Sequence, residues 1–180
     1  MMLLNSFSSL ATLTLVVTLI VPQGLSAQTA GLSGGAHLGA AELRALTDSL
    51  SAIAARQPGR QVPGRPLHRD STVSMFLLRR DTSSRPEIHD HVTEIFVLQT
   101  GRAVVISGGR AEGAGPMEPG EWNGGQIVPD KTDGAEIRPI VRRAVGPGDI
   151  VMMPARVPHQ IVVESGGSVT YLVIKIRAGS

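Results

Sequence analysis

The chain shows two hydrophobic patterns, one with a helical period and one with the period of strands. Between residues 40 and 56, leucine or isoleucine recurs every three or four positions from Leu43 to Ile53. This spacing predicts one amphipathic helix, which Pro58 would end. The helix would cover an open side or end of the structure that follows, or form a contact between subunits.

From about residue 70 onward, apolar residues alternate with polar ones or form short runs bounded by glycine and proline, which is typical of strands. The predicted strands are 71–80, 94–99, 102–107, 136–144, 149–153, 160–164 and 169–177. Pro139 interrupts the fourth of them and favours an edge or bulged position there. The pattern therefore predicts an all-β domain with one N-terminal helix.

Residues 108–135 break this pattern, because they are rich in glycine and proline and contain the lone Trp122. They are predicted to form a long loop, and compact domains seldom keep such a loop without a use. One interpretation is a lid over a pocket, with Trp122 as an apolar wall. The other is a surface insertion that Trp122 pins into a groove. Glu121 and Gln126 are its candidate polar residues.

The N-terminal segment has the pattern of a signal peptide. It carries no charged residue before Glu42, is apolar from Leu10 to Val21, and ends in small residues at Ala27. Residues 1–27 are therefore predicted to be cleaved, and residues 28–69 to hold a flexible lead-in, the helix and an irregular crossing. The protein would be exported to the periplasm or the medium, without stable membrane insertion after cleavage. An uncleaved anchor is the alternative, although the apolar run is short for a hydrocarbon core of about 30 Å.

Composition limits the number of domains and the kinds of partner that the sequence predicts. The roughly 150 residues that follow the signal peptide suffice for one domain. The net charge is +2, the sequence pI is 9.7, and the chain has one tyrosine and one tryptophan. Its basic residues are scattered among acids, so no nucleic-acid surface is predicted. The absence of cysteine excludes disulfides and a lipid-modified cysteine.

Candidate metal ligands lie in two distant segments. His89 and His91 are two residues apart, and side chains at this spacing share one face of a strand. Glu94 follows them, and a predicted hairpin would return His159 towards the pair. These four side chains predict a site for a divalent iron, manganese, nickel, copper or zinc ion. Alternatively, Glu94 would hydrogen-bond to a ligand histidine.

The two segments resemble the paired motifs of the cupin superfamily, over about residues 70–177. The first motif reads HxH, three or four residues, E, six residues and G; the second reads G, five residues, PxG, two residues and H. The matching residues are His89, His91, Glu94, Gly101, Gly148, Pro154 and His159. The resemblance implies a single cupin barrel, a double-stranded β-helix or jelly roll, in which both motifs supply metal ligands.

The sequence departs from these motifs at four places. Only two residues separate His91 from Glu94, and Ser83 stands where a glycine usually precedes the first histidine. Arg156 replaces the middle glycine of the second motif, and Val163 replaces a trailing asparagine. The resemblance further implies a homodimer, with residues 136–144 or the helix as contacts.

The predicted function is that of a metal-dependent enzyme, most simply a dioxygenase-like oxidoreductase acting on a small organic molecule. A metal-dependent isomerase or decarboxylase is an alternative. A non-catalytic exported protein that binds a sugar or an acid is another. Candidate pocket residues are Arg79, Phe96, Trp122 and Gln126, with either Arg79 or its neighbour Arg80 facing the barrel mouth. No side chain stands out as a separate general base.

Overall fold

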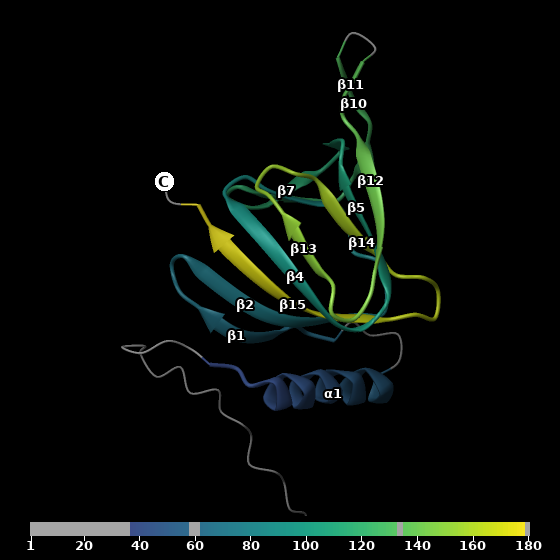
Figure 1. The fold of residues 1–180 in the computed structure, drawn as a ribbon. Coiled ribbons are helices and arrows are strands. Elements are labelled where there is room, and N and C mark those ends of the chain that lie inside the picture. Colours follow the sequence, from purple (N-terminus) through teal and green to yellow (C-terminus); the bar gives the residue numbers. More distant parts are fainter. Residues whose placement is uncertain (1–36, 58–61, 133–134, 179–180) are drawn as a thin grey trace, which may run out of the picture.

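The computed structural model describes residues 37–57, 62–132 and 135–178. The elements are α1 Ala40–Arg56, β1 Arg65–Arg69, β2 Val73–Arg80, β3 Glu87–His89, β4 Val92–Gly101, β5 Ala103–Gly108, β6 Arg110–Glu112, β7 Gly115–Glu118, β8 Glu121–Asn123, β9 Gln126–Val128, β10 Asp130–Thr132, β11 Ala135–Arg138, β12 Ile140–Val145, β13 Ile150–Met153, β14 His159–Val162 and β15 Val169–Arg177 (Figure 1). The predicted signal peptide lies outside the described residues. Within those residues, no helix is both long and apolar enough to cross a membrane.

Two antiparallel sheets form the body of the protein. One has the strand order β1-β2-β15-β4-β13, and the other has the order β12-β5-β14-β3-β8-β7. From β12 to β15, successive strands alternate between the two sheets, which is the connectivity of a jelly roll. The structure confirms the predicted all-β barrel with one N-terminal helix.

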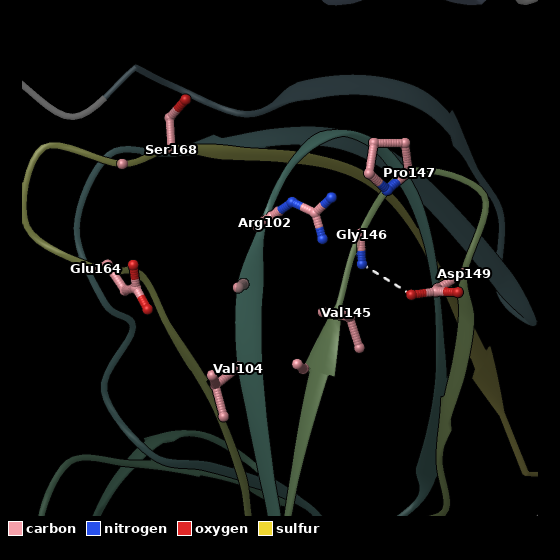
Figure 2. Close-up of a pocket in the computed structure, with 11 residues that line it drawn as sticks. Arg102, Val104, Val145, Gly146, Pro147, Asp149, Glu164 and Ser168 are labelled. Atoms are coloured by element: carbon pink, nitrogen blue, oxygen red, sulfur yellow. Dashed lines mark hydrogen bonds between the residues drawn. The ribbon is translucent and has the colours of Figure 1, made fainter.

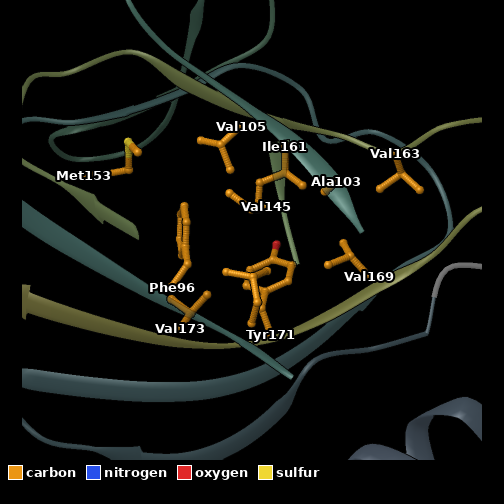
Figure 3. Packing of buried hydrophobic residues seen from close by; sticks show 11 residues of the cluster. Phe96, Ala103, Val105, Val145, Met153, Ile161, Val163, Val169, Tyr171 and Val173 are labelled. Atoms are coloured by element: carbon orange, nitrogen blue, oxygen red, sulfur yellow. The ribbon is translucent and has the colours of Figure 1, made fainter. Parts of the chain in front are cut away.

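The interior of the barrel follows from the alternation along β4. Every second residue from Val92 to Leu98 is buried, so this strand turns one face inward. Tyr171 fills the centre at 2% exposure, with its ring centroid 5.5 Å from that of Phe96 (Figure 3). The other buried members of this core are Leu98, Ala103, Val105, Val145, Met153, Ile161, Val163, Val169 and Val173. Glu94 is the charged exception among the inward residues of β4.

Helix α1 covers the outer face of the five-stranded sheet, beneath β1, β2 and β15 in Figure 1. Its Leu50 packs with Leu77 of β2 and Leu172 of β15, and all three side chains are buried. The leucine spacing of the helix therefore serves to cover the barrel, which is one of its two predicted roles. The predicted homodimer stays a prediction.

The sequence predicted one long loop over residues 108–135, and this prediction is wrong. These residues contain short strands, of which β8 pairs with β3 and β7, while β9 pairs with β6. The glycines between these strands that have positive φ are Gly109, Gly113, Gly120, Gly124 and Gly125. Strand pairing outweighs the low strand propensity of these residues. The pairing sets Glu121 opposite His89 in the six-stranded sheet.

Three motif positions have a left-handed backbone. Gly101 has φ 77°, Gly148 has φ 89°, and Arg156, which replaces a motif glycine, has φ 65°. A Cβ on Gly101 would overlap the carbonyl oxygen of Ser168, whereas one on Gly148 would meet nothing within 4 Å. Both glycines meet a conformational need, and Gly101 also permits a close approach of two strands.

We therefore expect Gly101→Ala to be more destabilising than Gly148→Ala. At Gly148 the change costs about 1 kcal/mol of backbone strain alone. At Gly101 the overlap adds about 1–3 kcal/mol. Urea unfolding of both variants measures the difference, and equal losses would contradict the close packing at Gly101.

Candidate metal centre

The candidate centre begins on the short strand β3. Glu87 and His89 lie two residues apart on this strand, so their side chains share one face. His89 is 2% exposed, and its Nε2 lies 3.8 Å from Oε2 of Glu87. The sequence analysis expected two histidines at i and i+2 on one face of a strand. In the structure, a glutamate and a histidine have this arrangement.

Glu94 and His159 complete the group from two other strands. Glu94 points inward from β4, and His159 is the first residue of β14. Oε1 of Glu94 is 3.3 Å from Nε2 of His89, and its Oε2 is 2.9 Å from Nε2 of His159. Potential ligand atoms of Glu87, His89, Glu94 and His159 all lie within 4.8 Å of one another. This cluster is called the four-residue centre below.

The separations of Glu94 from the two histidines fit a shared ion. With metal–ligand bonds of about 2.1 Å, two ligand atoms lie about 3.0 Å apart at a right angle and about 3.4 Å apart at the tetrahedral angle. Nε2 of both histidines and Oε2 of Glu94 are buried without a hydrogen-bond partner among the described residues. These atoms are close to one another but make no hydrogen bonds, as expected of ligands that share one ion.

An acceptor lies beside each imidazole ring, and the one beside His159 is close enough for a hydrogen bond. Nδ1 of His159 lies 3.0 Å from the carbonyl oxygen of Val157, and a proton held there leaves the lone pair of Nε2 free to bind a metal ion. Nδ1 of His89 lies 3.5 Å from Oε1 of Glu121. An acceptor behind each ring is the usual support of a metal-binding histidine. Glu121, a polar candidate from the sequence, therefore lies beside the centre.

Lys175 balances part of the negative charge. Its Nζ lies 3.2 Å from Oε1 of Glu94 and 3.7 Å from Oε1 of Glu121. Burial alone would raise the pKa of the Glu94 carboxyl, but nearby His159 and His89 and the charge of Lys175 hold that pKa well below its usual range. Burial alone would lower the pKa of His159, but Glu94 raises it above its usual value. Glu94 is therefore an anion at neutral pH.

Arg80 supports the opposite side of the centre. Its Nη2 lies 3.7 Å from Oε1 of Glu87, and its Nε donates a 2.7 Å hydrogen bond to the hydroxyl of Tyr171. Burial raises the pKa of Tyr171 to about 12, although Arg80 opposes this effect. The tyrosine therefore stays neutral and holds the guanidinium towards Glu87.

The structure places His91 away from the four-residue centre, contrary to the expectation from the sequence. Asp90 and His91 form a bend between β3 and β4, so the same-face rule of an extended strand does not apply to His89 and His91. The side chain of His91 is exposed and lies beside Gly120. Glu87 takes the place that the sequence gave to a histidine.

A shift of two residues accounts for the departure from the cupin motif. If Glu87 and His89 take the two HxH positions, four residues separate His89 from Glu94, as the motif requires. The interval from Glu94 to Gly101 is unchanged. The sequence signal for Glu87 was therefore the spacing of four residues between His89 and Glu94, which matches the motif. A search for two histidines alone misses this signal.

The other predicted pocket residues have different surroundings. Phe96 lies inside the barrel, with its ring centroid 5.9 Å from that of His159. Arg79 points away from the barrel interior, where its Nη1 donates to Ser51 of α1 and its Nη2 donates to Asp81. Of the two adjacent arginines, Arg80 is the one that approaches the centre.

Trp122 and Gln126 lie at the surface. Trp122 is 37% exposed, and its Nε1 donates to Oδ2 of Asp90 at 3.3 Å. Gln126 is exposed and donates to Glu112 at 3.4 Å. Strand pairing turns both away from the centre, while Glu121, the residue before Trp122, points towards it.

A cavity of about 150 Å³ opens beside the centre at the mouth of the barrel. This mouth cavity is lined by Arg69, Asp70, Ser71, Thr72, Val73, Ser74, Phe76, Val92, Glu118, Glu121, Lys175 and Arg177. Lys175 and Glu121 belong both to its lining and to the surroundings of the four-residue centre. A small molecule in the mouth cavity would therefore reach the side chains next to the candidate ligands.

A larger cavity of about 430 Å³ lies at the other end of the barrel (Figure 2). Arg102 points into it near Gly146, whose N–H donates to Asp149. Strand β4 runs from Val92, beside the centre, to Gly101, beside this cavity, a distance of about 30 Å for ten residues. The larger cavity is therefore separate from the candidate metal centre.

No family model and no curated protein matches the sequence. Among solved structures, a cupin-2 domain protein from Shewanella frigidimarina is 11% identical, with a TM-score of 0.44 over 73% of this chain and 92% of that chain. A Desulfitobacterium hafniense cupin superfamily protein is 17% identical, with a TM-score of 0.41 over 69% and 87%. Hydroquinone 1,2-dioxygenase from a Sphingomonas species is 13% identical, with a TM-score of 0.47 over 81% and 83%.

Proposed function

We propose that this protein is a cupin-type metalloenzyme, most simply a dioxygenase-like oxidoreductase, that acts on a small organic molecule in the barrel mouth. The observation that carries the proposal is the convergence of two imidazole nitrogens and two carboxylates within 4.8 Å of one another. The adjoining mouth cavity supports a catalytic rather than a purely structural site, because it gives a small molecule access to the neighbouring side chains.

The ligand types favour iron or manganese among the first-row ions. Carboxylate oxygens suit manganese and imidazole suits iron, whereas a copper(I) site would call for soft sulfur ligands. The four-residue centre offers carboxylate and imidazole ligands and no sulfur. A redox-active ion would supply oxygen activation, and a Lewis-acidic ion would polarise a carbonyl group.

The surrounding residues have separate tasks in this proposal. The carbonyl of Val157 orients the ring of His159, and Glu121 lies beside the ring of His89. Arg80 restrains Glu87 from the side opposite the mouth. Lys175 lies between Glu94 and the mouth cavity, so it is placed to meet an incoming molecule.

The test is elemental analysis of the protein expressed from Gln28 onward without a histidine tag, followed by measurement of oxygen consumption with candidate small acids and phenols. About one iron or manganese ion per chain, together with substrate-dependent oxygen uptake, would support the proposal. Bound metal with carbonyl-group isomerisation or decarboxylation, and no oxygen uptake, would favour Lewis-acid chemistry. No bound metal after reconstitution would overturn the enzyme proposal.

A metal-free binding protein is the second candidate. Glu94 already has Lys175 at 3.2 Å and His159 at 2.9 Å, and a protonated His159 would give the carboxylate two cationic partners without an ion. In that case the barrel would hold a small sugar or acid by shape and charge. Ligand binding that is unaffected by a chelator would support this candidate.

We also propose that the protein acts outside the cytoplasm. The apolar run from Leu10 to Val21 and the small residues before Gln28 support cleavage by a signal peptidase. N-terminal sequencing of the protein secreted by its host would test this, and a sequence that begins at Met1 would contradict it.

A further inference from the structure

We propose that the mouth cavity binds a small organic anion, a carboxylate of about five to seven non-hydrogen atoms, with Lys175 as its principal contact. This inference deepens the proposed function and rests on it for the role of the ion. It commits the substrate class to acids, in preference to neutral sugars or hydrocarbons.

The position of Lys175 follows from the strand register. On the inner face of the five-stranded sheet, Lys175 of β15 pairs with Ser74 of β2 on one side and with Glu94 of β4 on the other. Ser74 and Lys175 line the mouth cavity, whereas Glu94 belongs to the four-residue centre. The ammonium group of Lys175 therefore links the cavity to the centre.

Lys175 retains donor capacity for a ligand. An ammonium group has three donors, and Glu94 and Glu121 account for two close acceptors. The side chain is 24% exposed, so it is accessible from the cavity. When Glu94 binds an ion, its charge is shared with that ion and it competes less for Lys175.

The rim adds two more cations. Arg69 and Arg177 line the mouth cavity, and neither side chain has a partner among the described residues. Arg177 stands two residues beyond Lys175 on β15, about 7 Å towards the opening. A carboxylate that enters the mouth would therefore pass the guanidinium groups before it reaches Lys175.

The acids of the cavity are mostly engaged. Oδ1 of Asp70 accepts from the backbone N–H groups of Thr72 and Val73 at 2.7 Å, and its Oδ2 lies 2.9 Å from Nε2 of His68. These contacts lower the pKa of Asp70 to about 2. Glu121 faces His89 and Lys175. Asp70 and Glu118 are both exposed, and Glu118 is the one of the two without a hydrogen-bond or ion-pair partner among the described residues.

A bound divalent ion would make the region favour anions further. The three carboxylates of Glu87, Glu94 and Glu121 would then face Lys175, Arg80 and two charges on the ion. Positive charge would exceed negative charge by one unit if both histidines are neutral. A carboxylate ligand would remove this excess, whereas a neutral ligand would not.

The volume limits the size of the anion. A water molecule takes up about 30 Å³ of liquid, and an apolar cavity of about 150 Å³ holds one benzene ring. The mouth cavity has the same volume of about 150 Å³. It therefore accommodates the reacting part of a small acid, and a longer molecule would extend past the rim.

The probe pair for the test is glycolate and glycolamide, which have the same number of non-hydrogen atoms and differ in charge. Titration calorimetry of the manganese-loaded protein is expected to show glycolate binding roughly tenfold or more tighter than glycolamide. Lys175→Met is expected to remove this preference. Lys131→Met is the matched control, because Lys131 is exposed on β10, away from the mouth.

Metal content is measured for each variant, so the two proposals can fail separately. Manganese bound at wild-type stoichiometry with no preference for glycolate, or with a preference that survives Lys175→Met, overturns the anion site and leaves the metal proposal standing. No manganese uptake overturns the metal proposal, and glycolate binding that depends on Lys175 in the metal-free protein would still support the anion site. If Lys175→Met fails to fold, Arg177→Gln at the exposed rim is expected to weaken glycolate about threefold or more, and an unchanged affinity counts against the proposal.

Discussion

Replacement of His159 by alanine is expected to weaken metal binding by more than about 100-fold, whereas replacement of His91 by alanine is expected to leave it unchanged. Loss of a residue that only orients a ligand costs about 10–100-fold in metal affinity, so loss of a ligand should exceed that range. Nε2 of His159 lies 2.9 Å from Glu94 inside the barrel, while the side chain of His91 is exposed. Manganese titration with elemental analysis measures both affinities.

His91→Ala is a matched control, because both variants lose an imidazole from a motif position. Glu87→Gln adds a third arm, since it removes the charge from the residue that replaces a motif histidine. A loss of metal in His91→Ala but not in Glu87→Gln would show that the ordinary motif register holds. Thermal unfolding of each variant separates loss of a ligand from loss of the fold.

The fold could be predicted from the sequence because its main signals are local. The spacing from Leu43 to Ile53 predicted a helix over residues 40–56, and α1 has these bounds. The apolar run within residues 94–99 predicted a strand there, and β4 includes these residues. The motif resemblance marked Gly101, and the structure shows there a left-handed backbone where two strands approach closely.

Strand pairing between distant segments could not be predicted in the same way. Each strand in residues 108–135 has only three or four residues and little intrinsic preference for strand. These segments become strands because each finds a backbone partner: β8 pairs with β3, and β6 and β9 pair with each other. The same pairing brings Glu121 to His89, so the position of Glu121 next to the centre depends on a tertiary contact.

The identity of the ligands depended on one local backbone feature. The i, i+2 rule holds for Glu87 and His89 within β3, but the bend at Asp90 and His91 ends the strand. The residues that match the motif best are therefore not all in the centre. Likewise, both Arg79 and Arg80 end β2, and only the sheet register determines that Arg80 approaches Glu87.

Replacement of Leu77 by alanine is expected to lower the free energy of unfolding by about 2–5 kcal/mol. Leu77 is 0% exposed and packs with Leu50 of α1 and Leu172 of β15 between the helix and the sheet. The truncated side chain would leave a cavity that α1 can fill only by shifting. Urea unfolding followed by circular dichroism measures this loss.

Ile150→Ala is the matched control, because Ile150 lies in the same sheet, on the edge strand β13, but is 70% exposed. Its replacement is expected to change the free energy of unfolding by less than about 0.5 kcal/mol. If Leu77→Ala were as mild as Ile150→Ala, α1 would not be packed against this face in solution. A large difference between the two would instead show that α1 is part of the folded domain, because its leucines cover the sheet that carries Glu94 and Lys175.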